Sequence, residues 1–332
     1  MSLDDIRRRG QRIKTWGIEG DVRSQIEGTG ELPIMYRALG TPAQTGHPFN
    51  LYGDILSQPQ ALRETFEHTD EIDAIARQLA ERDVNGIIGL GSGTSQFVAQ
   101  VANAAFERFA GIPAQDFDSQ AFLRFTPPLD FERTVAIPYS GSGSTVDTIA
   151  AARLCRSRGA WTLAFTSVDG SPVVEATDAR ILTAGGFDTG GSDTFHYTTR
   201  IAAAIYLALE VGRLRQPGVH PYDELKARLR ASGERMAAIV ESVDARSRTV
   251  AAALHRVRSI IVVGAGANYG TAEEITLKFE EMAHIPCSAM DPGRHIHGAL
   301  GLTREDILTV IVAPPGPAYD DLLAIARVTQ ML

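Results

Sequence analysis

The sequence is poor in cysteine and has no long apolar run. Its 332 residues include only two cysteines, Cys155 and Cys287, whose spacing fits neither a disulfide framework nor a zinc site. No apolar run reaches the roughly 18 residues of a membrane-spanning helix, and the N-terminus lacks the apolar segment of a secretory signal. We therefore expect a cytoplasmic protein with no membrane partner and no bound metal.

An excess of positive charge is also missing. The chain carries 32 Lys and Arg residues against 40 Asp and Glu, a formal net charge of −8, and the two signs are interspersed. This distribution argues against an extended basic surface for nucleic acid. The apolar share of 44% and the charged share of 22% are typical of a globular protein, and the length allows about two α/β domains.

The chain contains two copies of one unit, offset by 173 positions without a gap. Gly91 of the first copy corresponds to Gly264 of the second. The dipeptide Ile112-Pro113 likewise recurs as Ile285-Pro286. A match of this length indicates the duplication of a whole domain.

Each copy alternates short apolar strands with helices, a pattern typical of parallel sheets covered on both faces. The fold class predicted is therefore α/β, with two flavodoxin-like or Rossmann-like lobes. We predict an N-terminal arm and helix over residues 1–69, the first lobe over 70–216, and linker helices with the second lobe over 217–332. The second lobe is short, because it ends at the counterpart of position 159 in the first.

A hydroxyl-rich turn follows the strand predicted over Thr134–Pro138. It consists of Ser140-Gly141-Ser142-Gly143-Ser144-Thr145 and leads into a helix. The start of a helix offers free N–H groups and a positive dipole end, so the turn is a candidate cradle for phosphate or sulfonate. The second copy has Ala313-Pro314-Pro315-Gly316-Pro317-Ala318 instead. Because this twin forms a turn without hydroxyls, the hydroxyls of the first copy indicate an anion site and not only a helix cap.

A second glycine-rich turn, Gly89 to Ser95, follows the first strand. It fails the G-x-G-x-x-G pattern, because Thr94 occupies the last glycine position. A dinucleotide site with Asp116 or Asp118 as ribose acceptor is the alternative. We prefer the hypothesis that Thr94 and Ser95 add donors to the same anion or to sugar hydroxyls.

Two charged segments of the second copy could carry acid–base chemistry. In the helix predicted over Tyr269–His284, Glu274, Lys278 and Glu281 share one face. The segment Gly293 to Gly298 holds His295 and His297 and is predicted to be a loop, because a glycine stands at each end. An ordinary solvated helix face and ordinary loop histidines are the alternatives.

These motifs, in this order, resemble the sugar-isomerase (SIS) family, which includes the isomerase domain of glucosamine-6-phosphate synthase and fructosamine-phosphate deglycases. The resemblance covers about residue 50 to the end. It rests on Gln58-Pro59-Gln60-Ala61-Leu62, Gly93-Thr94-Ser95, the turn that starts at Ser140, Glu274-x-x-x-Lys278-x-x-Glu281, and His297-Gly298.

The resemblance implies a role for each matching residue. Thr94, Ser95 and the hydroxyls of the turn (Ser140, Ser142, Ser144, Thr145) would bind the substrate, with its phosphate held chiefly by Ser95, Ser140, Ser142 and Thr145. Glu281 would move a proton between C1 and C2, Lys278 would orient the sugar chain, and His297, supplied by a dimer partner, would assist ring opening. Ser192 would belong to a substrate loop, although its match needs a shift of one residue. Gly141 stands where the family has glutamine, and the glutaminase domain of the synthase is not part of this sequence.

The predicted function is an aldose–ketose isomerase of a sugar phosphate, with no cofactor and a site shared within a homodimer. The partner would be a small anionic sugar. Alternatives are a deglycase that cleaves a phosphorylated fructosamine, an isomerase of a sulfonated sugar such as sulfoquinovose, and a regulator that binds a sugar phosphate without turnover.

Overall fold

The structure is a computed structural model that describes residues 47–185, 188 and 190–332. Most of the arm predicted for the N-terminus therefore lies outside the described residues. The helix predicted within residues 1–69 corresponds to α4 (Asn50–Glu67). None of the helices in the described part of the chain combines the length and apolar character that a membrane span needs.

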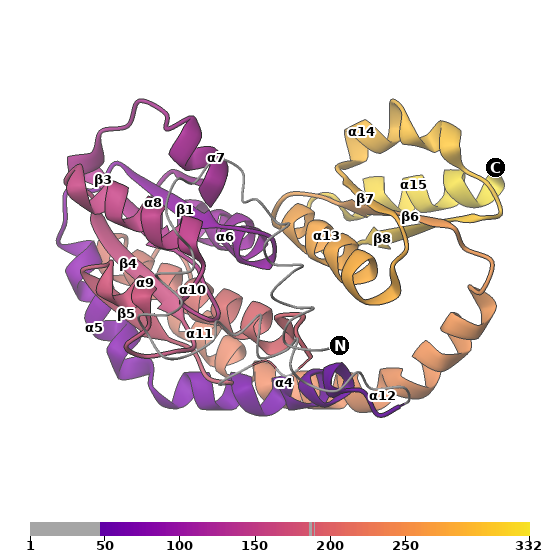
Figure 1. Cartoon of the computed structure of the whole chain (residues 1–332), viewed down its shortest axis with the longest axis horizontal. Coiled ribbons are helices and arrows are strands. Elements are labelled where there is room, and N and C mark those ends of the chain that lie inside the picture. The colour runs from indigo at the N-terminus through magenta and orange to yellow at the C-terminus, as the bar shows by residue number, and fades with distance from the viewer. Residues whose placement is uncertain (1–46, 186–187, 189) are drawn as a thin grey trace, which may run out of the picture. The chain divides into compact units, whose positions relative to one another are not determined.

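The first lobe is a parallel five-stranded sheet in the order β2-β1-β3-β4-β5 (Figure 1). The strand predicted over Thr134–Pro138 is present as β3 with the same bounds. The elements of the lobe are α5 (Thr69–Ala80), β1 (Gly86–Gly91), α6 (Thr94–Ala105), β2 (Ala114–Asp118), α7 (Ser119–Arg124), β3 (Thr134–Pro138), α8 (Val146–Ser157), β4 (Trp161–Thr166), α9 (Pro172–Glu175), β5 (Ala179–Leu182) and α10 (Thr194–Arg215).

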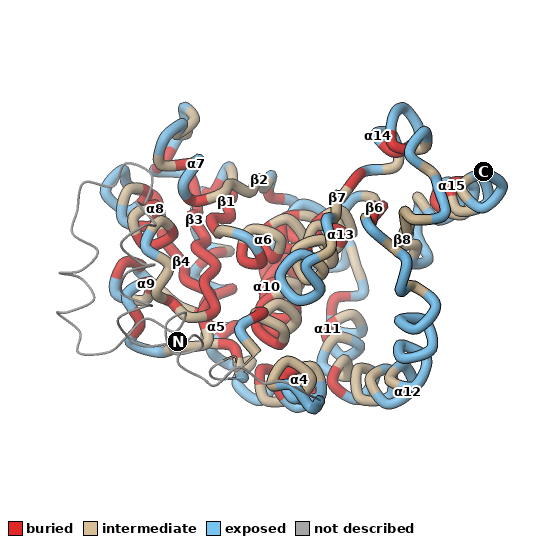
Figure 2. The backbone as a smooth tube through the Cα atoms, turned by 45° about the vertical axis from the view of Figure 1, so that its right-hand side comes forward, coloured by how far each residue is buried: buried red, intermediate tan, exposed pale blue. Residues whose placement is uncertain are grey.

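Both faces of the central strands β1, β3 and β4 are buried, which explains why these strands are largely apolar. Alternate residues of a strand point to opposite faces. Ile87 packs in the core beneath α5, α6 and α10, whereas Ile88 and Leu90 pack on the opposite face with Phe122 of α7 and Ala151 of α8. Figure 2 shows the strands β1, β3 and β4 as the buried centre of this lobe.

The second lobe repeats the central part of the first. Its parallel sheet has three strands in the order β7-β6-β8, which matches β2-β1-β3. Two helices, α11 (Tyr222–Arg230) and α12 (Ser232–Ala253), precede it. Its elements are β6 (Ser259–Gly264), α13 (Ala267–Lys278), β7 (Cys287–Met290), α14 (Pro292–Ile296), β8 (Ile307–Val312) and α15 (Tyr319–Met331).

The duplication extends to details of the backbone. Helices α6 and α13 each continue into one π-helical turn, over Phe106–Ala110 and Phe279–Ala283. The glycines before these helices, Gly93 and Gly266, have φ and ψ angles that agree within one degree. The 173-residue offset therefore relates two copies of one fold, as the sequence predicted.

One predicted loop is wrong: residues 292–296 form the short helix α14. The carboxylate of Asp291 accepts a hydrogen bond of 2.9 Å from the backbone N–H of Arg294 and so caps the helix. Asp118 does the same for Ala121 in the first lobe. The flanking glycines thus do not prevent a helix, because a capping side chain satisfies its free N–H groups.

The strand order determines where a ligand can bind in the first lobe. In the order β2-β1-β3-β4-β5, the chain leaves the sheet to opposite sides after β1 and β3, so these strands flank the topological switch point. Ligands of open α/β sheets bind at the carboxyl ends of such strands. The two turns singled out in the sequence, after Gly91 and after Pro138, both lie there.

Helices α6 and α13 pack against each other and join the two lobes, and Figures 1 and 2 show them side by side. Glu274 of α13 is buried near this contact, only 6% exposed. Burial raises the pKa of Glu274 to about 7, although the Lys278 ammonium and the Thr94 hydroxyl act in the opposite direction.

The glycines that end β1 and β6 give a first prediction. A Cβ on Gly91 would lie 2.5 Å from the backbone carbon of Ser95, and one on Gly264 would lie 2.2 Å from the carbonyl oxygen of Asn268. We expect Gly91→Ala and Gly264→Ala each to lower the free energy of unfolding by about 1–3 kcal/mol. Urea unfolding measures this. Gly86→Ala, in the same strand as Gly91, is the control, since its Cβ finds its nearest neighbour at 3.8 Å. Equal effects of Gly86→Ala and Gly91→Ala would contradict the explanation.

The buried Glu274 gives a prediction on pH. Its pKa is higher in the folded protein than the ordinary value of 4.5, so the folded state holds this proton more tightly than the unfolded state does. The stabilisation that this proton gives is complete below about pH 4.5 and is lost as the pH rises through about 7. We expect Glu274→Gln to remove this loss. The free energy of unfolding of the variant should then exceed that of the wild type by up to about 3 kcal/mol at pH 8, and the two values should lie closer together at pH 5. Thermal unfolding from pH 5 to 8 measures this, with exposed Glu280→Gln as control. A difference that does not grow with pH would refute the prediction.

Candidate active site

The hydroxyl-rich turn lies between the end of β3 and the start of α8. Its hydroxyls pair within the turn, because Ser140 Oγ lies 3.2 Å from Thr145 Oγ1 and Ser142 Oγ lies 2.9 Å from Ser144 Oγ. The helix α8 begins at the next residue, so its free N–H groups and positive dipole end face the turn. The structure thus brings together the four hydroxyls that the sequence singled out.

Thr94 and Ser95 lie in the first turn of α6 and are both largely buried. Ser95 Oγ accepts a hydrogen bond of 2.7 Å from Arg200 of α10. The two carboxylates that a dinucleotide site would need are engaged elsewhere. Asp116 accepts a hydrogen bond of 3.0 Å from Gln96, and Asp118 caps α7. This arrangement disfavours the dinucleotide alternative.

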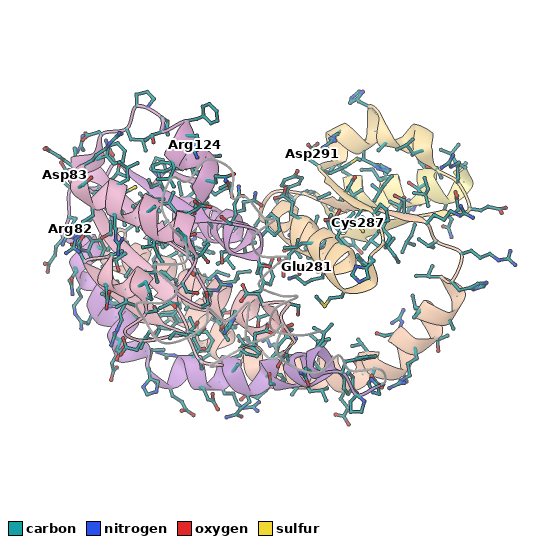
Figure 3. The ribbon with its side chains drawn as sticks, in the orientation of Figure 1. Arg82, Asp83, Arg124, Glu281, Cys287 and Asp291 are labelled. Atoms are coloured by element: carbon teal, nitrogen blue, oxygen red, sulfur yellow. The ribbon has the colours of Figure 1, made fainter. Side chains whose placement is uncertain are left out.

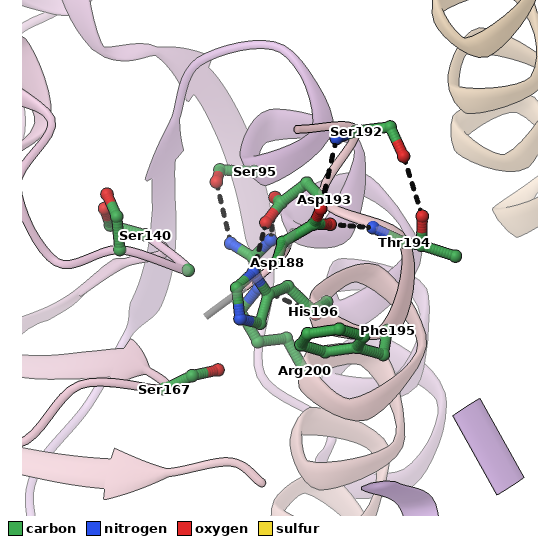
Figure 4. Close-up of polar contacts among 12 residues, drawn as sticks. Ser95, Ser140, Ser167, Asp188, Ser192, Asp193, Thr194, Phe195, His196 and Arg200 are labelled. Atoms are coloured by element: carbon green, nitrogen blue, oxygen red, sulfur yellow. Dashed lines mark hydrogen bonds and ion pairs between the residues drawn. The ribbon is translucent and has the colours of Figure 1, made fainter. Parts of the chain in front are cut away.

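Three polar residues of the site were missed by the sequence analysis: Arg200, Asp193 and His196. The guanidinium of Arg200 forms an ion pair with Asp193, and the same carboxylate lies 2.6 Å from His196 Nδ1. Figure 4 shows this network beside Ser95, with Ser140 on a neighbouring loop. The sequence does contain one signal of this network, a single arginine in the otherwise apolar run after Thr199, because a buried arginine needs an acidic partner.

Asp193 carries a negative charge in this network. Burial alone would raise its pKa, but the Arg200 guanidinium, His196 and Lys278 outweigh burial and hold the pKa far below the usual range. The fully buried Arg200 is therefore matched by a nearby carboxylate. The Arg200–Asp193 pair thus carries no net charge.

A metal ion could in principle be bound where side-chain ligand atoms of Asp188, Asp193 and His196 lie within 4.8 Å of one another. The carboxylate of Asp188, however, already accepts backbone N–H bonds of 2.7 Å from Gly191 and 2.8 Å from Thr194, which shape the turn before α10. The Asp193 oxygens face Arg200 and His196, and the guanidinium would repel a cation. The residues present therefore fit an internal network better than a metal centre.

The second lobe contributes Lys278 and Glu281. Lys278 Nζ lies 2.7 Å from Glu281 Oε2, 3.5 Å from Glu274 Oε1, and 2.5 Å from the backbone oxygen of Ser192 in the first lobe. Glu281 lies in the π-helical turn after α13, where Figure 3 labels it, and is partly exposed. Its carboxylate can therefore reach solvent or a ligand while Lys278 holds it.

The remaining candidates are placed less closely together. Ser192 is buried, and its hydroxyl lies 2.7 Å from that of Thr194, while its backbone oxygen meets Lys278. His297 is exposed at the end of α14, and no contact in the described part of the chain joins it to Glu281. His295 is completely buried and corresponds to the buried Phe122 of the first lobe. Its ring thus belongs to the core of the second lobe.

A chain of contacts connects the carboxylate of the second lobe to the hydroxyls of the first. It runs from Glu281 to Lys278 and on to the backbone of Ser192. The next residue, Asp193, binds Arg200, and Arg200 binds Ser95. The contacts therefore link the Glu281 carboxylate of the second lobe to the Ser95 hydroxyl of the first.

Both lobes of the chain match a known domain family. Residues 67–210 and 253–330 match the SIS domain family. A glutamine–fructose-6-phosphate aminotransferase (isomerizing) of Pyrococcus horikoshii is 28% identical over 316 residues, which cover 94% of this chain and 51% of that protein. The chain thus spans about half the length of the curated relatives it matches.

Solved structures show the same fold. The C-terminal domain of glucosamine-fructose-6-phosphate aminotransferase from Francisella tularensis matches with a TM-score of 0.74 and 19% identity, covering 87% of this chain and 83% of that one. Tagatose-6-phosphate ketose/aldose isomerase from Escherichia coli matches with a TM-score of 0.66 and 19% identity, covering 86% and 80%. The family match spans most of the chain in both lobes, and the chain therefore belongs to the SIS domain family.

Proposed function

We propose that this protein is an aldose–ketose isomerase of a sugar phosphate, with Glu281 as the base. The observation that carries the proposal is the Lys278 bridge, which ties Glu281 to the Ser192 loop beside the hydroxyls of the first lobe. Relatives whose names include isomerising activity on fructose 6-phosphate, and a neighbour named for ketose/aldose isomerisation, support the choice of reaction.

The phosphate would bind where the turn Ser140–Thr145 meets the start of α8. Hydroxyls and helix N–H groups donate to a phosphate without a lysine or arginine contact. Thr94 and Ser95, at the start of α6, would donate from the neighbouring strand end. This cradle would hold the tail of an open-chain sugar and leave its carbonyl end toward the second lobe.

Proton transfer would take place at the carbonyl end. The Glu281 carboxylate removes the proton from C2 of the aldose while the C1 carbonyl oxygen gains a proton from water, which gives an enediol. Glu281 then returns its proton to C1, and the C2 hydroxyl releases its proton to water to become the ketose carbonyl. The Lys278 ammonium would stabilise the negative charge that develops on oxygen. His297 of a second copy would assist ring opening.

Glu281 provides the direct test of the proposed function. We expect the wild type to exchange a C1 hydrogen of fructose 6-phosphate for deuterium in D₂O, measured by NMR. Glu281→Gln should bind the same sugar but exchange at least about a hundredfold more slowly, because it cannot accept the proton. Glu280→Gln, which removes the neighbouring exposed carboxylate, should exchange normally.

The outcomes separate the alternatives. A wild type that binds but never exchanges would identify a regulator and refute the isomerase. Release of free amine from a fructosamine 6-phosphate would favour the deglycase, and binding of a sulfonated sugar in preference to its phosphate analogue would favour the sulfo-sugar isomerase.

The cradle gives a separate prediction on affinity. Ser142→Ala combined with Ser144→Ala removes both members of a hydroxyl pair, so no hydroxyl of this pair remains in the folded protein without its partner. We expect this double variant to bind glucitol 6-phosphate about tenfold or more weakly, because hydrogen bonds to a charged group are lost. Calorimetric titration measures this.

The matched control lies at the other end of the same helix. Ser157 donates to the backbone of Leu154 at the end of α8, and Ser157→Ala should leave the affinity unchanged. Equal losses for the cradle variant and the control would show that the turn does not bind the phosphate.

A further inference from the structure

A fully buried arginine lies directly behind the proposed cradle. Arg200 has no exposed surface, and its three nitrogens bond to three different groups. Nε donates to the backbone oxygen of His196 at 2.8 Å, Nη1 donates to Ser95 Oγ at 2.7 Å, and Nη2 binds the Asp193 carboxylate. The guanidinium is thereby fixed in one orientation.

The bond to Ser95 has a defined direction. A guanidinium has N–H donors and no acceptor, so Ser95 Oγ must accept. A hydroxyl that accepts from arginine keeps its own O–H proton for another partner. The contact with Arg200 therefore makes Ser95 a donor, which is the polarity that an anion requires.

Asp193 links this arginine to the hydroxyl-rich turn. A Cβ on Gly141 would lie 2.6 Å from Asp193 Oδ1 and 2.8 Å from His196 Nδ1, so the backbone of the turn packs directly on this pair. The neighbouring residue, Ser192, accepts the hydrogen bond from Lys278. The Arg200 network thus contacts the loop after β1, the loop after β3 and the loop that reaches the second lobe.

We propose that Arg200 is a positioning residue for phosphate binding, which acts by holding the Ser95 hydroxyl as a donor toward the substrate anion. The inference rests on the proposed function. Arg200 itself does not contact the anion, because it is fully buried and its three nitrogens are bound by His196, Ser95 and Asp193. Its contribution to affinity therefore passes through Ser95.

A double-mutant cycle tests this route. The probe is glucitol 6-phosphate, with unphosphorylated glucitol as reference, and the variants are Arg200→Gln, Ser95→Ala and their combination. An amide can also accept a hydrogen bond, so glutamine no longer forces Ser95 to donate outward. We expect Arg200→Gln to weaken binding about tenfold in the wild-type background and less than about twofold in the Ser95→Ala background.

The conservative variant and a structural control separate positioning from general stability. Arg200→Lys keeps a side chain that can only donate, so it should recover part of the affinity that Arg200→Gln loses. It also replaces Arg200→Gln in the cycle if that variant does not fold. Arg213→Gln removes an ion pair with buried Glu210 on the same helix. It should lower the melting temperature without changing the affinity for the phosphate.

Two results would overturn the inference. Equal losses from Arg200→Gln in both Ser95 backgrounds would mean that Arg200 does not act through Ser95, and the proposed function would stand. A wild type that binds neither glucitol 6-phosphate nor fructose 6-phosphate would overturn the proposed function and this inference together.

Discussion

The ammonium of Lys278 is the contact on which the proposed site depends. It is the point where the second lobe touches the Ser192 loop of the first, and it also binds Glu281. Without it, the carboxylate would lie on a partly exposed turn with no described link to the hydroxyls of the first lobe. A lysine suits this place, because three donors on one nitrogen can serve a backbone oxygen and two carboxylates together.

The duplication explains how two equivalent lobes came to hold different chemistry. The backbone of the loop and helix is kept in both copies, but the side chains differ at corresponding positions. Val101, Ala105 and Arg108 of the first lobe correspond to Glu274, Lys278 and Glu281 of the second. The hydroxyl-rich turn of the first lobe corresponds to the proline-rich turn of the second, where prolines remove N–H donors. Under the proposed function, one copy would supply the anion cradle and the other the proton carrier.

Much of the fold could be predicted from the sequence, because apolar strands with glycine-rich ends are a local signal. The turns after β1 and β3 and the helix that carries Glu281 were located this way. The short helix α14 was missed, since its capping residue, Asp291, stands just before the segment that was considered. The Arg200 network was missed for a different reason. Arg200 and Ser95 are 105 residues apart, and only the packing of α10 on α6 brings them together.

The distribution of charge explains how an acidic chain could bind an anion. The formal charge of the chain is −8, yet Asp193 faces Arg200, and Glu281 faces Lys278. Glu274, with its pKa raised to about 7 by burial, is protonated in about half of the molecules near neutral pH. Each proton on Glu274 leaves Lys278 with one negative neighbour fewer. The positive charge near the sugar would therefore increase as the pH falls from about 8 to about 6, while the cradle, built from hydroxyls and N–H groups, keeps its polarity throughout.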